Sequence, residues 1–133
     1  MADPTIRKHI VFVYGTLLSG LGNHHIIEPG HFIADGETVE RFRMTAGGIP
    51  FVSRVDPVCR VRGELYIVND ETLADLDRLE GHPQFYCREL VEVEGPGGAI
   101  FTAWCYLCER GAGHHLVEDG DFRRVANAWG MGV

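Results

Sequence analysis

The sequence lacks a long hydrophobic run, has little positive charge and contains few serines, and each shortage excludes a class of function. Its longest apolar stretch, Ile10–Tyr14, falls far short of the about 20 residues that a membrane-spanning helix needs. Twelve Lys and Arg residues against nineteen Asp and Glu residues give a net charge of −7, so neither nucleic acid nor a membrane surface is an expected partner. Neither serine, Ser19 or Ser53, lies in the G-x-S-x-G motif of a nucleophile elbow.

The chain also lacks the signals of secretion. Residues 1–8 contain no apolar core followed by a cleavage site of small residues, so we expect a cytoplasmic protein. Cysteines in that compartment are normally reduced, and we expect all four to be free thiols that pack in the interior. They are Cys59, Cys87, Cys105 and Cys108.

Two patterns that resemble metal or redox sites are better explained by packing and by loops. Cys105 and Cys108 have C-x-x-C spacing, but they fall in a predicted strand, where residues three apart point to opposite faces. The paired histidines at 24–25 and 114–115 fall short of a three- or four-ligand zinc site, because neighbouring histidines rarely bind one ion together. We therefore predict no metal site.

What the sequence does contain is the composition of one globular domain. Of its 133 residues, 45% are hydrophobic and 23% are charged, a balance that excludes a disordered chain. Two domains of half this length would each be too small to bury a core. We therefore predict a single domain over residues 1–133.

Apolar runs separated by Gly and Pro predict a strand-rich domain. Asp35-Gly36 is an expected turn between two strands, and Gly63 is expected to mark a bulge or the close approach of another group. Predicted strands cover His9–Tyr14, His31–Met44, Val61–Val68, Phe85–Glu94 and Ile100–Cys108, and predicted helices cover Asp70–Glu80 and Phe122–Trp129. This order favours an α+β domain with a strongly curved or barrel-like sheet.

The predicted helix Asp70–Glu80 carries the most informative residue. Asp70 is its expected N-cap. A buried stripe is marked by Leu73, Leu76 and Leu79. At about 100° per residue Glu80 lies near the centre of that stripe, so its carboxylate is expected to point inward and to have a raised pKa, as a general base does. The alternative is that Glu80 turns to water or forms an ion pair with Arg88 or another arginine.

A second informative segment is the turn Tyr14-Gly15-Thr16-Leu17, which follows the first predicted strand. Gly15 has no Cβ, so another group can approach the backbone closely. Consecutive N–H groups of such a turn can bind an anion or a developing oxyanion. The alternative is an ordinary turn at the end of a strand.

Taken together, these segments resemble the γ-glutamylcyclotransferase-like superfamily, particularly its short γ-glutamylamine cyclotransferase branch. The first motif is Val11–Leu17, followed by Gly20 and Asn23-His24. The later motifs, in chain order, are Val61–Tyr66, Leu76–Gly81, Tyr86–Arg88, Ala103–Tyr106 and Gly120–Phe122. The likeness therefore extends over nearly the whole chain.

The resemblance implies a small mixed β-barrel with a few flanking helices, no cofactor, and a small-molecule γ-glutamyl amide as the substrate. Glu80 matches the catalytic glutamate of the family. The residues that match substrate-binding positions are Tyr14, Gly15, Thr16, Leu17, Tyr86 and Tyr106. The sequence departs from many relatives at residues 18–22 and at Phe122, which affects the expected leaving group more than the chemistry.

The reaction implied by the resemblance is a cyclisation that releases 5-oxoproline and a free amine. The substrate's own α-amine attacks its γ-carbonyl, with Glu80 as general acid and base, so the protein needs no nucleophile of its own. The alternative is a non-catalytic member of the same fold that binds a γ-glutamyl metabolite or a partner protein. The sequence leaves open which amine departs and how the protein assembles.

Overall fold

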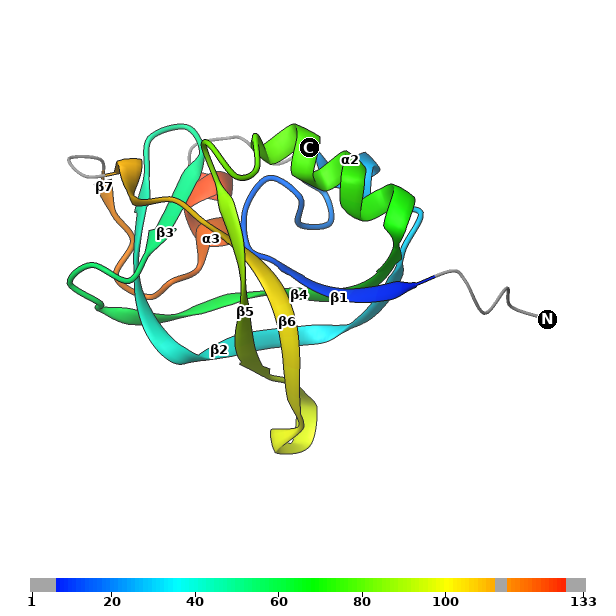
Figure 1. Ribbon diagram of the computed structural model, residues 1–133. Helices are drawn as coiled ribbons and strands as arrows, with labels where there is room; N and C mark the ends of the chain where they lie inside the picture. Colours follow the sequence, from blue (N-terminus) through cyan, green and yellow to red (C-terminus); the bar gives the residue numbers. More distant parts are fainter. Residues whose placement is uncertain (1–6, 112–114, 129–133) are drawn as a thin grey trace.

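The computed structural model describes residues 7–111 and 115–128, and a long curved sheet dominates it (Figure 1). Its strands are β1 (Lys8–Val13), β2 (His31–Ala46), β3 (Pro50–Ser53), β4 (Cys59–Asn69), β5 (Cys87–Glu94), β6 (Ile100–Leu107) and β7 (His115–Leu116). Its helices are α1 (His24–Ile27), α2 (Asp70–Glu80) and α3 (Phe122–Ala128), with short 3₁₀ turns at Pro96–Gly98 and Glu109–Gly111. The predicted mixture of strands and few helices is confirmed.

The sheet closes into a barrel. The strands follow the order β2-β4-β1-β6-β5, and β5 pairs again with β2, where Glu37 faces Glu94 and Thr38 faces Val93. The β1–β6 pair is parallel, with Val11 opposite Trp104, whereas the other pairs around the ring are antiparallel. This is the small mixed β-barrel that the resemblance implies.

Helices and loops cover the barrel ends. Figure 1 shows α2 lying along one end, above the loop that follows β1, while the β5–β6 turn projects from the opposite side. On α2 the buried side chains include Leu73 and Leu76, and on α3 they include Phe122 and Val125. Their burial attaches both helices to the core by the hydrophobic effect. The loop and the last turn of α2 are thereby brought to one end of the barrel.

One predicted turn is wrong. Asp35 and Gly36 lie inside β2, which is a single strand of 16 residues. Gly36 pairs with Gly63 of β4. A Cβ on Gly36 would lie 2.6 Å from Cγ1 of Val93, and a Cβ on Gly63 would lie 2.1 Å from the carbonyl oxygen of Val13. Both glycines therefore allow close approach of neighbouring strands, which confirms that expectation for Gly63.

The bounds of α2 agree with the prediction, but its details differ. Asn69 rather than Asp70 is the N-cap, because its side chain accepts a hydrogen bond from the N–H of Thr72. Gly81 ends the helix in the left-handed conformation, with φ of 67°. Leu79 is 41% exposed, so it does not belong to the buried stripe as expected.

The cysteine prediction is right for three residues and wrong for one. Cys59, Cys105 and Cys108 are buried, whereas Cys87 is exposed at the start of β5, and all four are free thiols. Within residues 7–111 and 115–128, no group of three or more His, Cys, Asp and Glu side chains is placed to hold a metal ion. No helix in the same ranges is long and apolar enough to cross a bilayer. The predictions for Trp129 and His114 lie outside the described residues.

Candidate functional site

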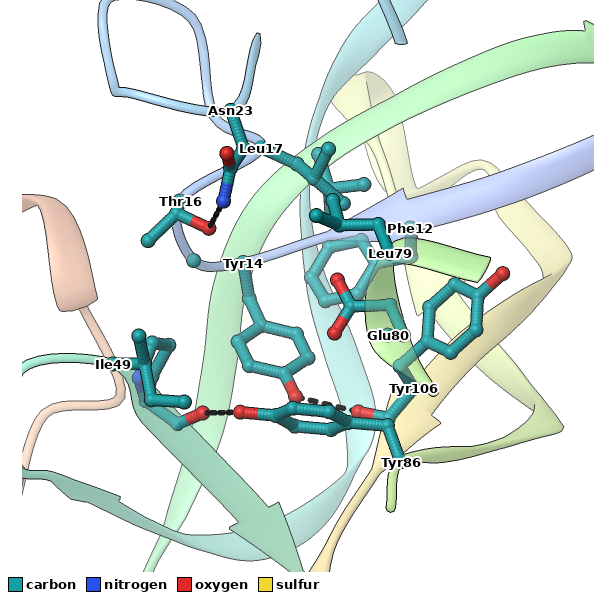
Figure 2. Close-up of a pocket in the computed structure, with 13 residues that line it drawn as sticks. Phe12, Tyr14, Thr16, Leu17, Asn23, Ile49, Leu79, Glu80, Tyr86 and Tyr106 are labelled. Atoms are coloured by element: carbon teal, nitrogen blue, oxygen red, sulfur yellow. Dashed lines mark hydrogen bonds between the residues drawn. The ribbon is translucent and has the colours of Figure 1, made fainter. Parts of the chain in front are cut away.

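A cavity of about 200 Å³ opens at the end of the barrel where α2 meets the loop after β1. Figure 2 shows its lining, which comes from β1, that loop, the start of β3, the end of α2 and two further tyrosines. The lining residues are Phe12, Val13, Tyr14, Gly15, Thr16, Leu17, Asn23, Ile49, Pro50, Leu79, Glu80, Tyr86 and Tyr106. All seven residues singled out from the sequence line this one cavity.

Glu80 is the only charged residue of this lining. Its carboxylate points into the cavity between Tyr14, Tyr86 and Leu79 (Figure 2). No hydrogen bond or ion pair joins it to any other side chain in the described part of the chain. Burial therefore acts alone and raises the pKa of Glu80 from 4.5 to about 7. A group with this pKa can accept and return a proton near neutral pH.

The ion pair expected as the alternative for Glu80 is formed by another residue. Arg88 of β5 lies 2.8 Å from Oδ1 of Asp77, which is one turn before Glu80 on α2. The guanidinium also lies over the ring of Trp104, 4.3 Å from its centroid. Arg88 is thus held by Asp77 and Trp104, and Glu80 keeps its carboxylate unpaired.

Asp77 shows the opposite electrostatic behaviour. Burial by itself would raise the pKa of Asp77, but hydrogen bonds from Arg88 and from the Tyr106 hydroxyl outweigh it and lower the pKa below its usual value. The last turn of α2 therefore carries one carboxylate that stays ionised and one that titrates near neutrality.

Three tyrosines present ring surface to the cavity while their hydroxyls are engaged elsewhere. The Tyr14 hydroxyl donates to the carbonyl oxygen of Tyr106, and the Tyr86 hydroxyl donates to that of Pro50 (Figure 2). The Tyr106 hydroxyl donates to Oδ1 of Asp77 at 2.7 Å. Burial raises the pKa of all three hydroxyls, so they remain protonated donors. They fix the shape of the cavity wall.

The loop after β1 is folded into successive turns. The N–H of Leu18 donates to the carbonyl oxygen of Gly15 at 2.9 Å, and the N–H of Asn23 donates to that of Thr16 at 2.9 Å. The Asn23 side chain also donates to Oγ1 of Thr16 (Figure 2). The N–H groups of Gly15, Thr16 and Leu17 have no acceptor among the described residues. They are therefore available to a ligand in the cavity.

Gly15 is required by the packing of this loop. A Cβ at this position would lie 2.6 Å from Cγ of Pro50, closer than real carbon atoms approach. The start of β3 thus lies directly against the loop. Sequence reasoning missed this wall, formed by Ile49 and Pro50, because these two residues lie between the predicted strands His31–Met44 and Val61–Val68 and were assigned to neither. The Gly-Gly-Ile-Pro segment carries no pattern that would have assigned it to a cavity.

Asn23 and Leu79 were also not predicted as cavity residues. Asn23 belongs to the first motif of the resemblance, and that position was the available signal. Leu79 lines the cavity next to Glu80 (Figure 2), although the residue is 41% exposed. The cavity therefore combines one titratable carboxylate, a row of backbone donors and an apolar border.

Comparison with known proteins adds independent evidence at this point. The family model for "Gamma-glutamyl cyclotransferase, AIG2-like" matches residues 11–124. A Methanocaldococcus jannaschii protein, named provisionally as a γ-glutamylcyclotransferase, is 38% identical over 114 residues, which cover 85% of this chain and 94% of that protein. The γ-glutamylaminecyclotransferase of Rattus norvegicus is 34% identical over 111 residues, which cover 73% of this chain and 74% of the rat protein.

A solved structure supports the same assignment. The crystal structure of an AIG2-like protein from Mus musculus has a TM-score of 0.73 and 27% sequence identity, and the match covers 86% of this chain and 89% of the mouse chain. The family model spans both the loop after β1 and the last turn of α2. The chain belongs to the γ-glutamyl cyclotransferase, AIG2-like family.

Proposed function

We propose that this protein is a γ-glutamyl amide cyclotransferase that releases 5-oxoproline and a free amine. The observation that carries the proposal is the position of Glu80, whose unpaired carboxylate with a pKa of about 7 lies in one cavity with the loop Tyr14–Leu17. A protein that only binds a metabolite gains nothing from such a group, because burying an unpaired carboxylate costs stability. A role in proton transfer explains why the Glu80 carboxylate lies in the cavity without a partner.

The proposed reaction begins with a proton transfer. The α-ammonium of the substrate cannot attack, so the Glu80 carboxylate first removes a proton from it. The α-nitrogen then forms a bond with the γ-carbonyl carbon, which closes a five-membered ring and places negative charge on the carbonyl oxygen. The bond from that carbon to the leaving nitrogen breaks, and Glu80 returns its proton to this nitrogen. The ring nitrogen still carries two hydrogens and loses one of them as a proton, which the departing amine takes up. The substrate is converted to 5-oxoproline and an amine, and no water is consumed.

The residues of the cavity can supply two contributions to the rate, general acid and base catalysis and the orientation of the substrate. A well-placed general acid or base contributes about 10²- to 10⁴-fold. Intramolecular attack in a well-oriented substrate gives effective molarities of about 10⁵ M or more, so the cavity wall has the task of folding the substrate. The rigid rings of Tyr14, Tyr86 and Tyr106, each fixed through its hydroxyl, suit that task.

The loop after β1 provides the other polar contacts. The N–H groups of Gly15, Thr16 and Leu17 can donate to the α-carboxylate of the substrate or to the developing oxyanion. The cavity volume of about 200 Å³ is below the roughly 300–1,000 Å³ of pockets for drug-sized ligands. It suits a single glutamyl group, with the leaving amine extending out of the cavity.

The test is an incubation of the purified protein with a panel of γ-glutamyl amides, including γ-glutamyl-ε-lysine and γ-glutamyl alkylamines, with 5-oxoproline, glutamate and amine measured by mass spectrometry. The expected products are 5-oxoproline and amine in equal amounts. The matched control substrate is the N-acetyl derivative, which lacks a nucleophilic amine and should not react. Glutamate in place of 5-oxoproline, or cleavage of the acetylated substrate, would show hydrolysis by water and contradict the proposal.

A further inference from the structure

The proposed reaction leaves one buried charged side chain without a role. Glu64 of β4 is 7% exposed and is the only charged residue in the buried set of the described chain. It does not line the cavity that holds Glu80. It lies instead between two other surface cavities, which it borders together with Asp35. Its location on β4 places it opposite Val13, the residue directly before the loop Tyr14–Leu17.

Glu64 accepts hydrogen bonds from Ser19 in the loop after β1, from Arg123 and, at 3.1 Å, from the Tyr66 hydroxyl. The Ser19 N–H donates to Oε1 of Glu64 at 2.9 Å, and the Ser19 hydroxyl donates to Oε2 at 2.8 Å. Arg123 of α3 donates to Oε2 of Glu64 at 3.2 Å. The same guanidinium donates to the Ser19 carbonyl oxygen at 2.6 Å. All polar groups of Ser19 are therefore bound by these two side chains, and the three residues are called the Ser19 clamp below.

None of the three residues of the Ser19 clamp lines the cavity that holds Glu80. Leu18 precedes Ser19 and is 3% exposed, and its N–H donates to the carbonyl oxygen of Gly15. The position of Ser19 therefore sets the position of the turn that starts at Gly15. Hydrogen bonds to ionised partners are about twice as strong as neutral ones, so this attachment is stiff. Without it, the turn would keep only neutral bonds and apolar packing.

We propose that Glu64 is a positioning residue for substrate binding. Through Ser19 and Arg123 it holds the loop in the shape in which the N–H groups of Gly15, Thr16 and Leu17 bind the α-carboxylate of the substrate. This inference rests on the proposed function. The α-carboxylate keeps its charge throughout the reaction, so these contacts stabilise the bound substrate and the transition state equally. Glu80 lies on α2, whereas the hydrogen bonds of the Ser19 clamp join the loop after β1, β4 and α3, so proton transfer is not altered.

The experiment compares Glu64→Gln and Arg123→Gln with the wild type in the 5-oxoproline assay. Both variants should raise KM by at least about tenfold and leave kcat within about threefold, because uniform binding is lost. The pH at half-maximal kcat should not move. The matched control is Arg124→Gln, at the next position of α3, because the exposed Asp119 is the only ion-pair partner of Arg124 among the described residues. This control should leave KM and kcat unchanged.

The outcomes separate this inference from the proposed function. If the wild type forms no 5-oxoproline from any substrate of the panel, the proposed function is wrong and this inference is wrong with it. If the wild type is active and both clamp variants keep the wild-type KM, or lose kcat at constant KM, only the role of Glu64 is wrong. Should Glu64→Gln not fold, Arg123→Gln and Ser19→Ala decide the question, because Ser19 is exposed and Arg123 is partly exposed.

Discussion

Two carboxylates one turn apart on α2 have opposite properties. Asp77 accepts hydrogen bonds from Arg88 and Tyr106, which lower its pKa, whereas Glu80 has no partner among the described side chains and its pKa is raised to about 7. The helix supplies the same backbone to both, so the difference comes from what each side chain faces. Asp77 stays charged and anchors a strand and a tyrosine. Glu80 can change its charge at physiological pH, which is what catalysis of proton transfer requires.

The largest effect on turnover is expected when Glu80, the carboxylate that titrates near pH 7, is replaced. Glu80→Gln keeps the shape of the side chain and removes the proton acceptor, so 5-oxoproline formation should fall by about 10²-fold or more. Steady-state kinetics on the preferred substrate measure this effect, with circular dichroism as the control for folding. A variant that keeps a tenth or more of the wild-type kcat would show that Glu80 is not the general base.

The pH dependence of turnover tests the raised pKa directly. Because the Glu80 carboxylate must be deprotonated to accept a proton, kcat/KM should rise with pH and reach half of its plateau near pH 7. Two pH units below this midpoint kcat/KM should be about 100-fold below its plateau, since the deprotonated fraction of Glu80 then falls about tenfold per pH unit. A midpoint near pH 4.5 would mean that the cavity is wet and Glu80 is not perturbed.

Removal of the paired carboxylate should act on stability first. Asp77→Asn replaces the charged acceptor of the Arg88 and Tyr106 hydrogen bonds, so the free energy of unfolding should fall by about 2–3 kcal/mol at pH 7. Urea denaturation measures it. The pH midpoint of kcat/KM should stay near 7, because burial alone sets the pKa of Glu80. If the pH midpoint of kcat/KM shifts in Asp77→Asn, then the pKa of Glu80 depends on the charge of Asp77, and the claim that burial alone sets it is wrong.

The stability of the wild type should also depend on Glu80. Its pKa is raised in the folded state, so the folded protein loses stability as pH rises from about 4.5 through about 7. Glu80→Gln removes this loss and should be more stable than the wild type by about 1–2 kcal/mol at pH 8, a value discounted for the partial exposure of Glu80. At pH 4 the two proteins should have similar stability. The measurement is denaturation at both pH values.

The smallest effect, a modest loss in the free energy of unfolding, is expected for Tyr106→Phe. Loss of the hydroxyl removes one of the hydrogen bonds that lower the pKa of Asp77, which should cost about 1 kcal/mol at pH 7. The stability that Asp77 provides is present above its unfolded pKa and is lost as pH falls through its folded pKa. The folded pKa is less depressed in the variant, so the variant should have less of this stability to lose and should complete the loss at a higher pH than the wild type. Acid titrations of both proteins, followed by circular dichroism, test this.

Local patterns predicted much of the fold and the placement of the main site residue. The helix Asp70–Glu80 has the predicted bounds because its acidic first turn, its leucines and Gly81 all favour the same helix. Helical periodicity indicated an inward orientation of Glu80 but left open the alternative that it turns to water or pairs with an arginine. The turn at Asp35-Gly36 was wrong because a glycine favours a turn and a close strand crossing equally, and only the position of Val93 decides between them.

The remaining parts of the site depend on contacts between distant segments. Pro50 reaches the cavity only because β3 pairs with the end of β2, and Arg88 turns away from Glu80 because Asp77 and Trp104 lie beside it. The Ser19 clamp joins residues from three separated segments. No periodicity within one segment encodes such contacts. The fold class and the key carboxylate were therefore predictable, whereas the walls and supports of the cavity were not.

The parallel pairing of β1 with β6 also affects how the protein is made. β1 is synthesised before its neighbour β6, and the Tyr106 carbonyl oxygen that accepts the Tyr14 hydroxyl lies 92 residues after Tyr14 in the chain. Such long-range pairing slows folding, because a large chain loop must close before the contact forms. The nascent chain therefore has no complete cavity until β6 has been synthesised.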